Sequence, residues 1–131
     1  MTPVPANVLI VDDDLDTCVV TSMLLRREGY RVTYATSVRE ALDLAFDGTF
    51  DVILLDNWMP EMSGVEVCRE LRSHEVKTPI IFQSAAAYST DKEEAESAGA
   101  QDYLVKPVDH QDLLTALRTA TNLSYSASTS N

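Results

Sequence analysis

Short apolar runs alternate with longer periodic segments along the chain. Five runs have the length of β-strands, at 8–11, 31–35, 52–55, 80–82 and 103–105. Runs without alternating polar residues are typical of strands that are buried on both faces of a parallel sheet. The second run is less uniform than the others, but the spacing of all five predicts the strands of one sheet.

Five further segments predict helices, at about 14–28, 38–46, 65–73, 90–98 and 111–122. Glycines follow three of them, as is common at helix ends. Ser37 with Glu40 three residues later forms a capping-box pattern at the start of the second. Because strands and helices alternate, we expect an α/β fold with a doubly wound parallel sheet and helices on both faces.

Length and charge exclude several classes of protein. The 131 residues fit one domain, and 10 Lys and Arg against 21 Asp and Glu give a net charge of −11. Binding to a phosphate backbone needs clustered positive charge, so we expect no direct nucleic-acid binding. The chain contains neither an apolar run of the roughly 20 residues that a membrane helix needs nor a signal-peptide pattern, so we expect a cytoplasmic protein. The Ser-rich segment 124–131 predicts a flexible tail or linker start after a domain at 1–123.

Polar residues close four of the predicted strands, at the edge where ligands of open α/β sheets bind. They are Asp12 to Asp14, Asp56, Ser84 and Lys106. Neighbouring carboxylates repel one another unless a cation compensates, and Mg²⁺ prefers oxygen ligands together with water and phosphate. Lys106 and Ser84 supply a positive charge and a hydroxyl for phosphate oxygens. A carboxylate between a metal and such groups can act as a nucleophile on phosphorus. Asp14 is interpreted as the N-cap of the first helix.

These segments together resemble the response-regulator receiver domain, the CheY-like phosphoacceptor module of two-component signalling. The resemblance covers about residues 7–123 and rests on four pieces in order, at 9–14, 56–64, 84–85 and 99–107. It implies a flavodoxin-like (βα)5 three-layer sandwich with the parallel strand order 2-1-3-4-5. It also implies a cis peptide bond between Lys106 and Pro107.

The resemblance assigns roles to individual residues. Asp56 is the expected phosphoacceptor, and Ser84 and Lys106 are expected to bind the phosphoryl oxygens. The expected ligands of Mg²⁺, or of Mn²⁺ in its place, are Asp13, Asp56 and the Trp58 backbone carbonyl, with Asp12 acting through water. Tyr103 is the expected switch residue, which turns inward when Ser84 moves toward the phosphate.

The positions of apolar residues on the expected first helix indicate a surface for a partner. At 100° per residue, Val20 and Leu24 fall on the face that we expect to meet the sheet, while Leu15, Val19 and Met23 form a second apolar ridge. Receiver domains dock a histidine-containing phosphodonor on this helix, so the resemblance implies docking at this ridge. The alternative is that neighbouring loops partly cover it.

The expected function is a phosphorylation-operated switch rather than an ordinary enzyme. A sensor histidine kinase or histidine phosphotransfer protein is the expected donor, and the surface of the last two helices and the strand between them is expected to control an unknown output partner. Arg118 is the single cation in the expected last helix, so a dimer through this surface is left open without support.

Three alternatives come from other classes. The first is a receiver-like interaction module that is never phosphorylated. The second is a small aspartyl-nucleophile phosphatase, which usually carries a second Asp where this chain has Trp58. The third is a flavodoxin-like cofactor carrier, whose flavin phosphate the acids at 12–14 would repel.

Overall fold

Five parallel strands form a sheet in the order β2-β1-β3-β4-β5 within residues 6–129, which the computed structural model describes, with side chains described through Asn122. The strands are β1 (Asn7–Val11), β2 (Arg31–Ala35), β3 (Val52–Leu55), β4 (Ile80–Ser84) and β5 (Asp102–Val105). The predicted α/β fold and its strand order are confirmed. Lys106-Pro107 is a cis peptide bond, as the resemblance implied.

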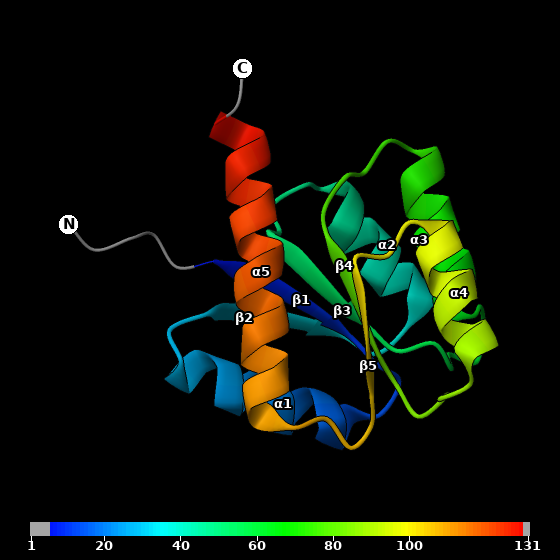
Figure 1. Ribbon diagram of the computed structural model, residues 1–131, viewed down its shortest axis with the longest axis horizontal. Helices are drawn as coiled ribbons and strands as arrows, with labels where there is room; N and C mark the ends of the chain where they lie inside the picture. The colour runs from blue at the N-terminus through cyan, green and yellow to red at the C-terminus, as the bar shows by residue number, and fades with distance from the viewer. Residues whose placement is uncertain (1–5, 130–131) are drawn as a thin grey trace.

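Helices cover both faces of the sheet (Figure 1). They are α1 (Leu15–Arg27), α2 (Val38–Phe46), α3 (Gly64–Ser73), α4 (Ser89–Ala98) and α5 (His110–Thr129). Buried residues of α1 and α5 pack in one cluster, and those of α2, α3 and α4 pack in another. This arrangement is the three-layer sandwich expected from the alternation of elements.

Alternate residues of β1 enter the two clusters. Leu9 and Val11 pack with α2, α3 and α4, whereas Val8 and Ile10 pack with α1 and α5. All four are at most 2% exposed. Burial on both faces explains why the central strands are uninterrupted apolar runs.

The last helix continues past its expected end at Asn122 and reaches Thr129. The expected boundary is wrong because the Ser-rich composition hides a segment without Gly or Pro, in which Leu123 and Ala127 favour helix. Residues 124–129 therefore belong to α5, and 130–131 lie outside the described residues. Whether this segment leads into a linker stays a prediction.

The inward face of α1 also differs from expectation. Val20 was expected to meet the sheet, but it is 57% exposed. The buried residues of α1 are Cys18, Thr21, Ser22 and Leu25. This stripe has helical spacing, but Thr21 and Ser22 are small polar residues. The spacing of the apolar residues alone therefore predicts the wrong inward face for α1.

Side-chain caps begin two of the helices. The Ser37 hydroxyl accepts a hydrogen bond from the Glu40 backbone N–H at 3.2 Å, as the capping-box pattern predicts. The Ser63 hydroxyl accepts one from the Glu66 N–H at the start of α3. Among residues 6–129, no helix is both long enough and apolar enough to cross a membrane.

Candidate functional site

The residues predicted at the strand ends meet at one edge of the sheet. Asp12 and Asp13 follow β1, Asp56 follows β3, Ser84 ends β4 and Lys106 follows β5. These four strands are consecutive neighbours in the sheet. One carboxylate oxygen from each of the three aspartates lies within 4.8 Å of the others. The fold therefore builds an acidic cluster, defined here as Asp12, Asp13 and Asp56.

Lys106 is the cation that faces the acidic cluster. Its Nζ donates a hydrogen bond to Asp12 Oδ2 at 2.7 Å and lies 3.6 Å from Asp56 Oδ2. Partial burial disfavours the charged ammonium, but the hydrogen bond to Asp12 and the charge of Asp56 outweigh this effect and raise the pKa of Lys106. The ammonium is therefore held in its charged form beside both carboxylates.

Asp56 lies in a less polar environment than an ordinary surface acid. It is 8% exposed, and this burial raises the pKa of its carboxyl group. The Trp58 N–H, which donates to Asp56 Oδ1 at 3.2 Å, and the charge of Lys106 oppose the shift without cancelling it. A further cation beside Asp56 would favour its ionised form.

The acidic cluster has the chemistry of a site for a hard divalent cation. Its members offer carboxylate oxygens, which Mg²⁺ and Mn²⁺ accept. Asp12 is buried at 2% exposure, whereas Asp13 is exposed, so the cluster opens to solvent on the Asp13 side. This opening suits an ion that keeps several water ligands.

The loop after Asp56 is bound to the start of α3. Asn57, which sequence reasoning did not single out, is buried, and its Oδ1 accepts a hydrogen bond from the Val65 N–H at 3.1 Å. The backbone oxygen of Asn57 accepts another from the Gly64 N–H at 2.9 Å. The sequence signal for this role is that a second polar residue, Asn57, follows Asp56 after an apolar strand. Trp58 follows and is 65% exposed.

Ser84 ends β4, and Tyr103 is the second residue of β5, beside Phe82 of β4. Ser84 is fully buried, and its hydroxyl accepts a hydrogen bond from the Ala86 N–H at 3.2 Å. The Tyr103 hydroxyl donates to the Ala86 carbonyl at 2.7 Å, and its ring stacks on Phe82 with centroids 5.6 Å apart. Burial raises the pKa of Tyr103. The expected switch residue therefore points inward and is connected to Ser84 through Ala86.

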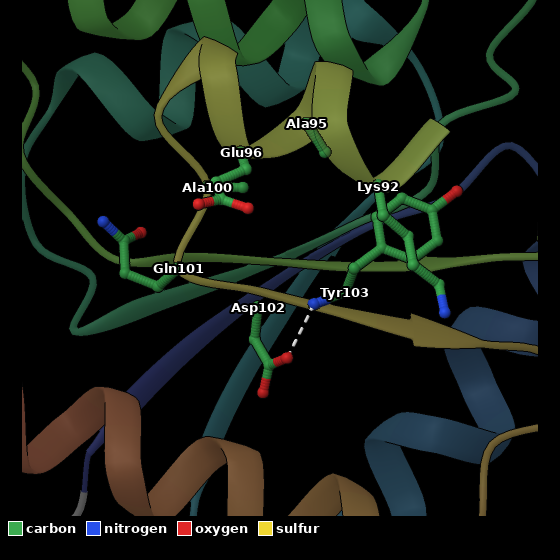
Figure 2. Close-up of a pocket in the computed structure, with 7 residues that line it drawn as sticks. All are labelled: Lys92, Ala95, Glu96, Ala100, Gln101, Asp102 and Tyr103. Atoms are coloured by element: carbon green, nitrogen blue, oxygen red, sulfur yellow. Dashed lines mark hydrogen bonds between the residues drawn. The ribbon is translucent and has the colours of Figure 1, made fainter. Parts of the chain in front are cut away.

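A surface pocket of about 400 Å³ lies between α4 and β5, and Tyr103 is one of the residues that line it. Figure 2 shows Tyr103 directed toward α4, while Asp102 leaves the strand on the opposite side. Lys92 and Glu96 of α4 line this pocket together with Tyr103. A change in the position of Tyr103 would therefore alter the lining of an exposed surface.

The expected docking ridge faces solvent. Leu15 is 53% exposed, Val19 38% and Met23 60%.

Near the start of α1, Asp14 occupies the N-cap position, but its side chain accepts a hydrogen bond from the Thr17 hydroxyl rather than from a backbone N–H. That bond lowers the pKa of Asp14. Asp14 therefore lies at the helix start and outside the acidic cluster.

The sequence matches the response regulator receiver domain family over residues 8–118. It is 38% identical over 114 residues to the uncharacterized transcriptional regulatory protein YkoG of Bacillus subtilis, covering 87% of this chain and 50% of that protein. The transcriptional regulatory protein ZraR of Escherichia coli is 36% identical over 114 residues, with 87% and 26% covered. The chain thus spans about a quarter to a half of the length of these relatives.

The fold has close counterparts among solved structures. The chemotaxis protein CheY4 of Vibrio cholerae is 36% identical to this chain, superposes with a TM-score of 0.83, and covers 88% of this chain and 98% of its own. The chain therefore belongs to the response regulator receiver domain family, whose general function is that of a phosphorylation switch in two-component systems. Members of this family are generally not ordinary enzymes.

Proposed function

We propose that Asp56 accepts a phosphoryl group from a phosphohistidine and that this reaction requires Mg²⁺ or Mn²⁺. The observation that carries the proposal is the meeting of the acidic cluster with Lys106, whose Nζ lies 3.6 Å from Asp56 Oδ2. A carboxylate oxygen of Asp56 attacks phosphorus, the P–N bond breaks, and the imidazole of the donor takes the electron pair. The product is an aspartyl phosphate.

Different residues would bind the divalent ion and the phosphoryl oxygens during phosphoryl transfer. Asp13 and Asp56, with the Trp58 carbonyl, would hold the divalent ion, and Asp12 would act on it through water. When bound, that ion neutralises charge on the phosphoryl oxygens. Lys106 exchanges part of its contact with Asp12 for a phosphoryl oxygen, and the Ser84 hydroxyl donates to another.

Phosphorylation is proposed to alter the surface formed by α4, β5 and α5. The Ser84 hydroxyl now accepts from the Ala86 N–H, and Tyr103 donates to the Ala86 carbonyl. Movement of Ser84 toward a phosphoryl oxygen changes the geometry of this connection and biases the position of Tyr103. The pocket between α4 and β5 changes with it, so an output partner or domain would read the change there.

The ridge formed by Leu15, Val19 and Met23 is proposed to dock the phosphodonor, either a sensor histidine kinase or a histidine phosphotransfer protein. Its support is the exposure of three apolar side chains on α1, the helix that begins two residues after Asp13. Exposed apolar groups that gather beside a reactive site favour a protein contact.

The competing proposal is a receiver-like interaction module that is never phosphorylated. Intact mass spectrometry separates the two when the protein is incubated with Mg²⁺ and acetyl phosphate. We expect a mass gain of one phosphoryl group that is lost in Asp56→Asn and suppressed by EDTA. Asp43→Asn, which removes an exposed acid of α2, is the matched control and should gain mass as the wild type does. A wild-type protein that gains no mass would favour the interaction module.

A further inference from the structure

Asn57 lies between two groups of the candidate site. It follows Asp56, the proposed phosphoacceptor, and precedes Trp58, whose carbonyl is proposed to hold the divalent ion. The Trp58 N–H also donates to Asp56 Oδ1 at 3.2 Å. The positions of the Asp56 carboxylate and of the Trp58 carbonyl therefore both depend on how the backbone of Asn57 is held.

Asn57 accepts the first two backbone donors of α3. Its carbonyl oxygen accepts from the Gly64 N–H at 2.9 Å, and its side-chain Oδ1 accepts from the Val65 N–H at 3.1 Å. The first N–H groups of a helix have no acceptor within the helix, so an outside group has to supply one. The next of them in α3, the Glu66 N–H, is bound by the Ser63 hydroxyl. A single residue thus ties the loop of the candidate site to the helix at two points.

Neither backbone conformation nor packing explains why residue 57 is an asparagine. Asparagine is enriched where φ is positive, but within residues 6–129 Glu75 is the only non-glycine residue with a positive φ. Asn57 is 8% exposed, and a buried amide costs free energy unless it is hydrogen-bonded. The hydrogen bond from Val65 is therefore the reason that the structure gives for a polar side chain at this position.

Asn57 is closely surrounded on the side of α3. A Cβ atom added at Gly64 would lie 2.8 Å from Asn57 Cα, so the helix and the loop approach each other through their backbones. The Asn57 side chain also lies near the Tyr103 hydroxyl, because its hydrogen bonding, like that of Ser84, opposes the burial that raises the pKa of Tyr103. The loop that carries Asp56 is thus held in place largely through its next residue.

We infer that Asn57 is a positioning residue for the phosphorylation of Asp56. Its side chain fixes residues 56–58 against α3, so that the Asp56 carboxylate and the Trp58 carbonyl can hold the same divalent ion. Asn57 acts through these two neighbours. The inference rests on the proposed function, because it takes Asp56 to be the phosphoacceptor and the ion to be Mg²⁺ or Mn²⁺. Loss of a group that orients metal ligands from outside the coordination shell typically lowers metal affinity or activity about 10- to 100-fold.

The test is Asn57→Leu, which keeps the approximate size of the side chain and removes the Oδ1 acceptor. With acetyl phosphate as the donor and Mg²⁺ as the metal, we expect phosphorylation to slow about tenfold or more. The dissociation constant of Mg²⁺, followed by tryptophan fluorescence, should rise about tenfold as well. Trp58 is the only tryptophan of the chain, so this signal comes from the loop itself.

Ser63→Ala is the matched control, because it also removes a side-chain acceptor from the first turn of α3. Both hydrogen bonds of the Ser63 hydroxyl go to Glu66 and neither goes to the loop. We expect Asn57→Leu and Ser63→Ala each to lower the melting temperature by a few degrees, as the loss of a helix cap does. Mg²⁺ affinity and phosphorylation, measured well below these melting temperatures, should fall in Asn57→Leu alone. Asn57→Ala repeats the test with a smaller side chain, in case leucine packs poorly.

Three results would overturn the inference. Wild-type Mg²⁺ affinity in both Asn57 variants would show that the loop keeps its place without the amide. Equal losses of Mg²⁺ affinity and rate in Ser63→Ala would show that any weakening of the start of α3 has the same effect, so Asn57 would be a helix cap alone. Failure of acetyl phosphate to phosphorylate the wild type would instead remove the proposed function, and the inference with it.

Discussion

Gly64 occupies a position where any side chain would collide with the loop that carries Asp56. A Cβ atom there would lie 2.5 Å from the Asp56 carbonyl oxygen, 2.8 Å from Asn57 Cα and 2.9 Å from Phe82 Cε2. The first two are backbone atoms, which cannot rotate away as a flexible side chain can. The absence of a side chain at Gly64 thus fixes how closely α3 approaches the candidate site.

We therefore expect Gly64→Ala to displace the loop and to impair both stability and phosphorylation. Overpacking of this kind costs about 1–3 kcal/mol of unfolding free energy. A shift of about 1 Å in a reacting group can slow its chemistry about 100-fold. Urea denaturation and the rate of phosphorylation by acetyl phosphate measure the two effects.

Gly48→Ala is the control, because it introduces backbone strain without a steric collision. Gly48 has a φ of +77°, which disfavours alanine, but nothing lies within 4 Å of a Cβ added there. This variant should lose stability and still be phosphorylated at the wild-type rate. A Gly64→Ala protein that reacts as fast as the wild type would contradict the role given to the close contact.

At the scale of elements, Arg72 joins the end of α3 to the segments before β4 and β5. Its Nη1 donates to the carbonyls of Val76 at 2.7 Å and Thr78 at 2.9 Å. Its Nε and Nη2 both donate to the Gly99 carbonyl, and Nη2 also reaches Gln101 Oε1 at 3.1 Å. Burial lowers the pKa of Arg72. Carbonyl groups, rather than a carboxylate, surround this guanidinium.

Arg72→Lys should destabilise the protein even though it keeps the charge. A single ammonium cannot satisfy carbonyls that approach from two separate segments, whereas the planar guanidinium can. The loss of two or three hydrogen bonds corresponds to about 2–3 kcal/mol of unfolding free energy, measured by urea denaturation. Arg69→Lys, an exposed change on the same helix, should stay within about 0.5 kcal/mol. A similarly small effect for Arg72→Lys would contradict the stabilising role given to the hydrogen bonds of the Arg72 guanidinium.

Most elements could be predicted from the sequence because burial on two faces leaves a visible pattern. The runs at 8–11 and 52–55 are apolar without interruption, and each becomes a central strand. The pattern failed where small polar residues fill a buried position, as Ser22 does on α1. It also failed at the end of α5, where a Ser-rich composition forms helix.

The residues that meet at the acidic cluster were predictable because each closes a strand, and the fold aligns strand ends. Their roles in phosphoryl transfer stay predictions. Arg72 was not predictable in the same way. Its partners are mostly backbone carbonyls, which leave no trace in the sequence.

For the whole molecule, folding concentrates a small part of the net charge of −11 at one edge of the sheet. Oxygens of three carboxylates lie within 4.8 Å of one another, and Lys106 contacts two of them, those of Asp12 and Asp56. Counting the three acids as ionised, −3 + 1 leaves two negative charges at the cluster. The unliganded protein therefore carries a repulsion that a divalent cation would relieve.

We accordingly expect Mg²⁺ to stabilise the folded protein, because an ion that binds the native state alone shifts the unfolding equilibrium. At ten times the dissociation constant, the gain is about 1.4 kcal/mol. Thermal denaturation in EDTA and in MgCl₂, at matched ionic strength, measures it. Asp13→Asn should raise the melting temperature in EDTA, since it removes one repelling charge, and should lose most of the gain from Mg²⁺.

A higher melting temperature in EDTA together with a smaller gain from Mg²⁺ in Asp13→Asn would distinguish a metal site from a general response to salt. Asp43→Asn removes one charge from the exposed surface of α2, away from the acidic cluster, and should keep the full gain from Mg²⁺. If Asp13→Asn gained as much from Mg²⁺ as the wild type does, the ion would act by screening the overall negative charge. The acidic cluster would then owe its geometry to the alignment of strand ends rather than to metal binding.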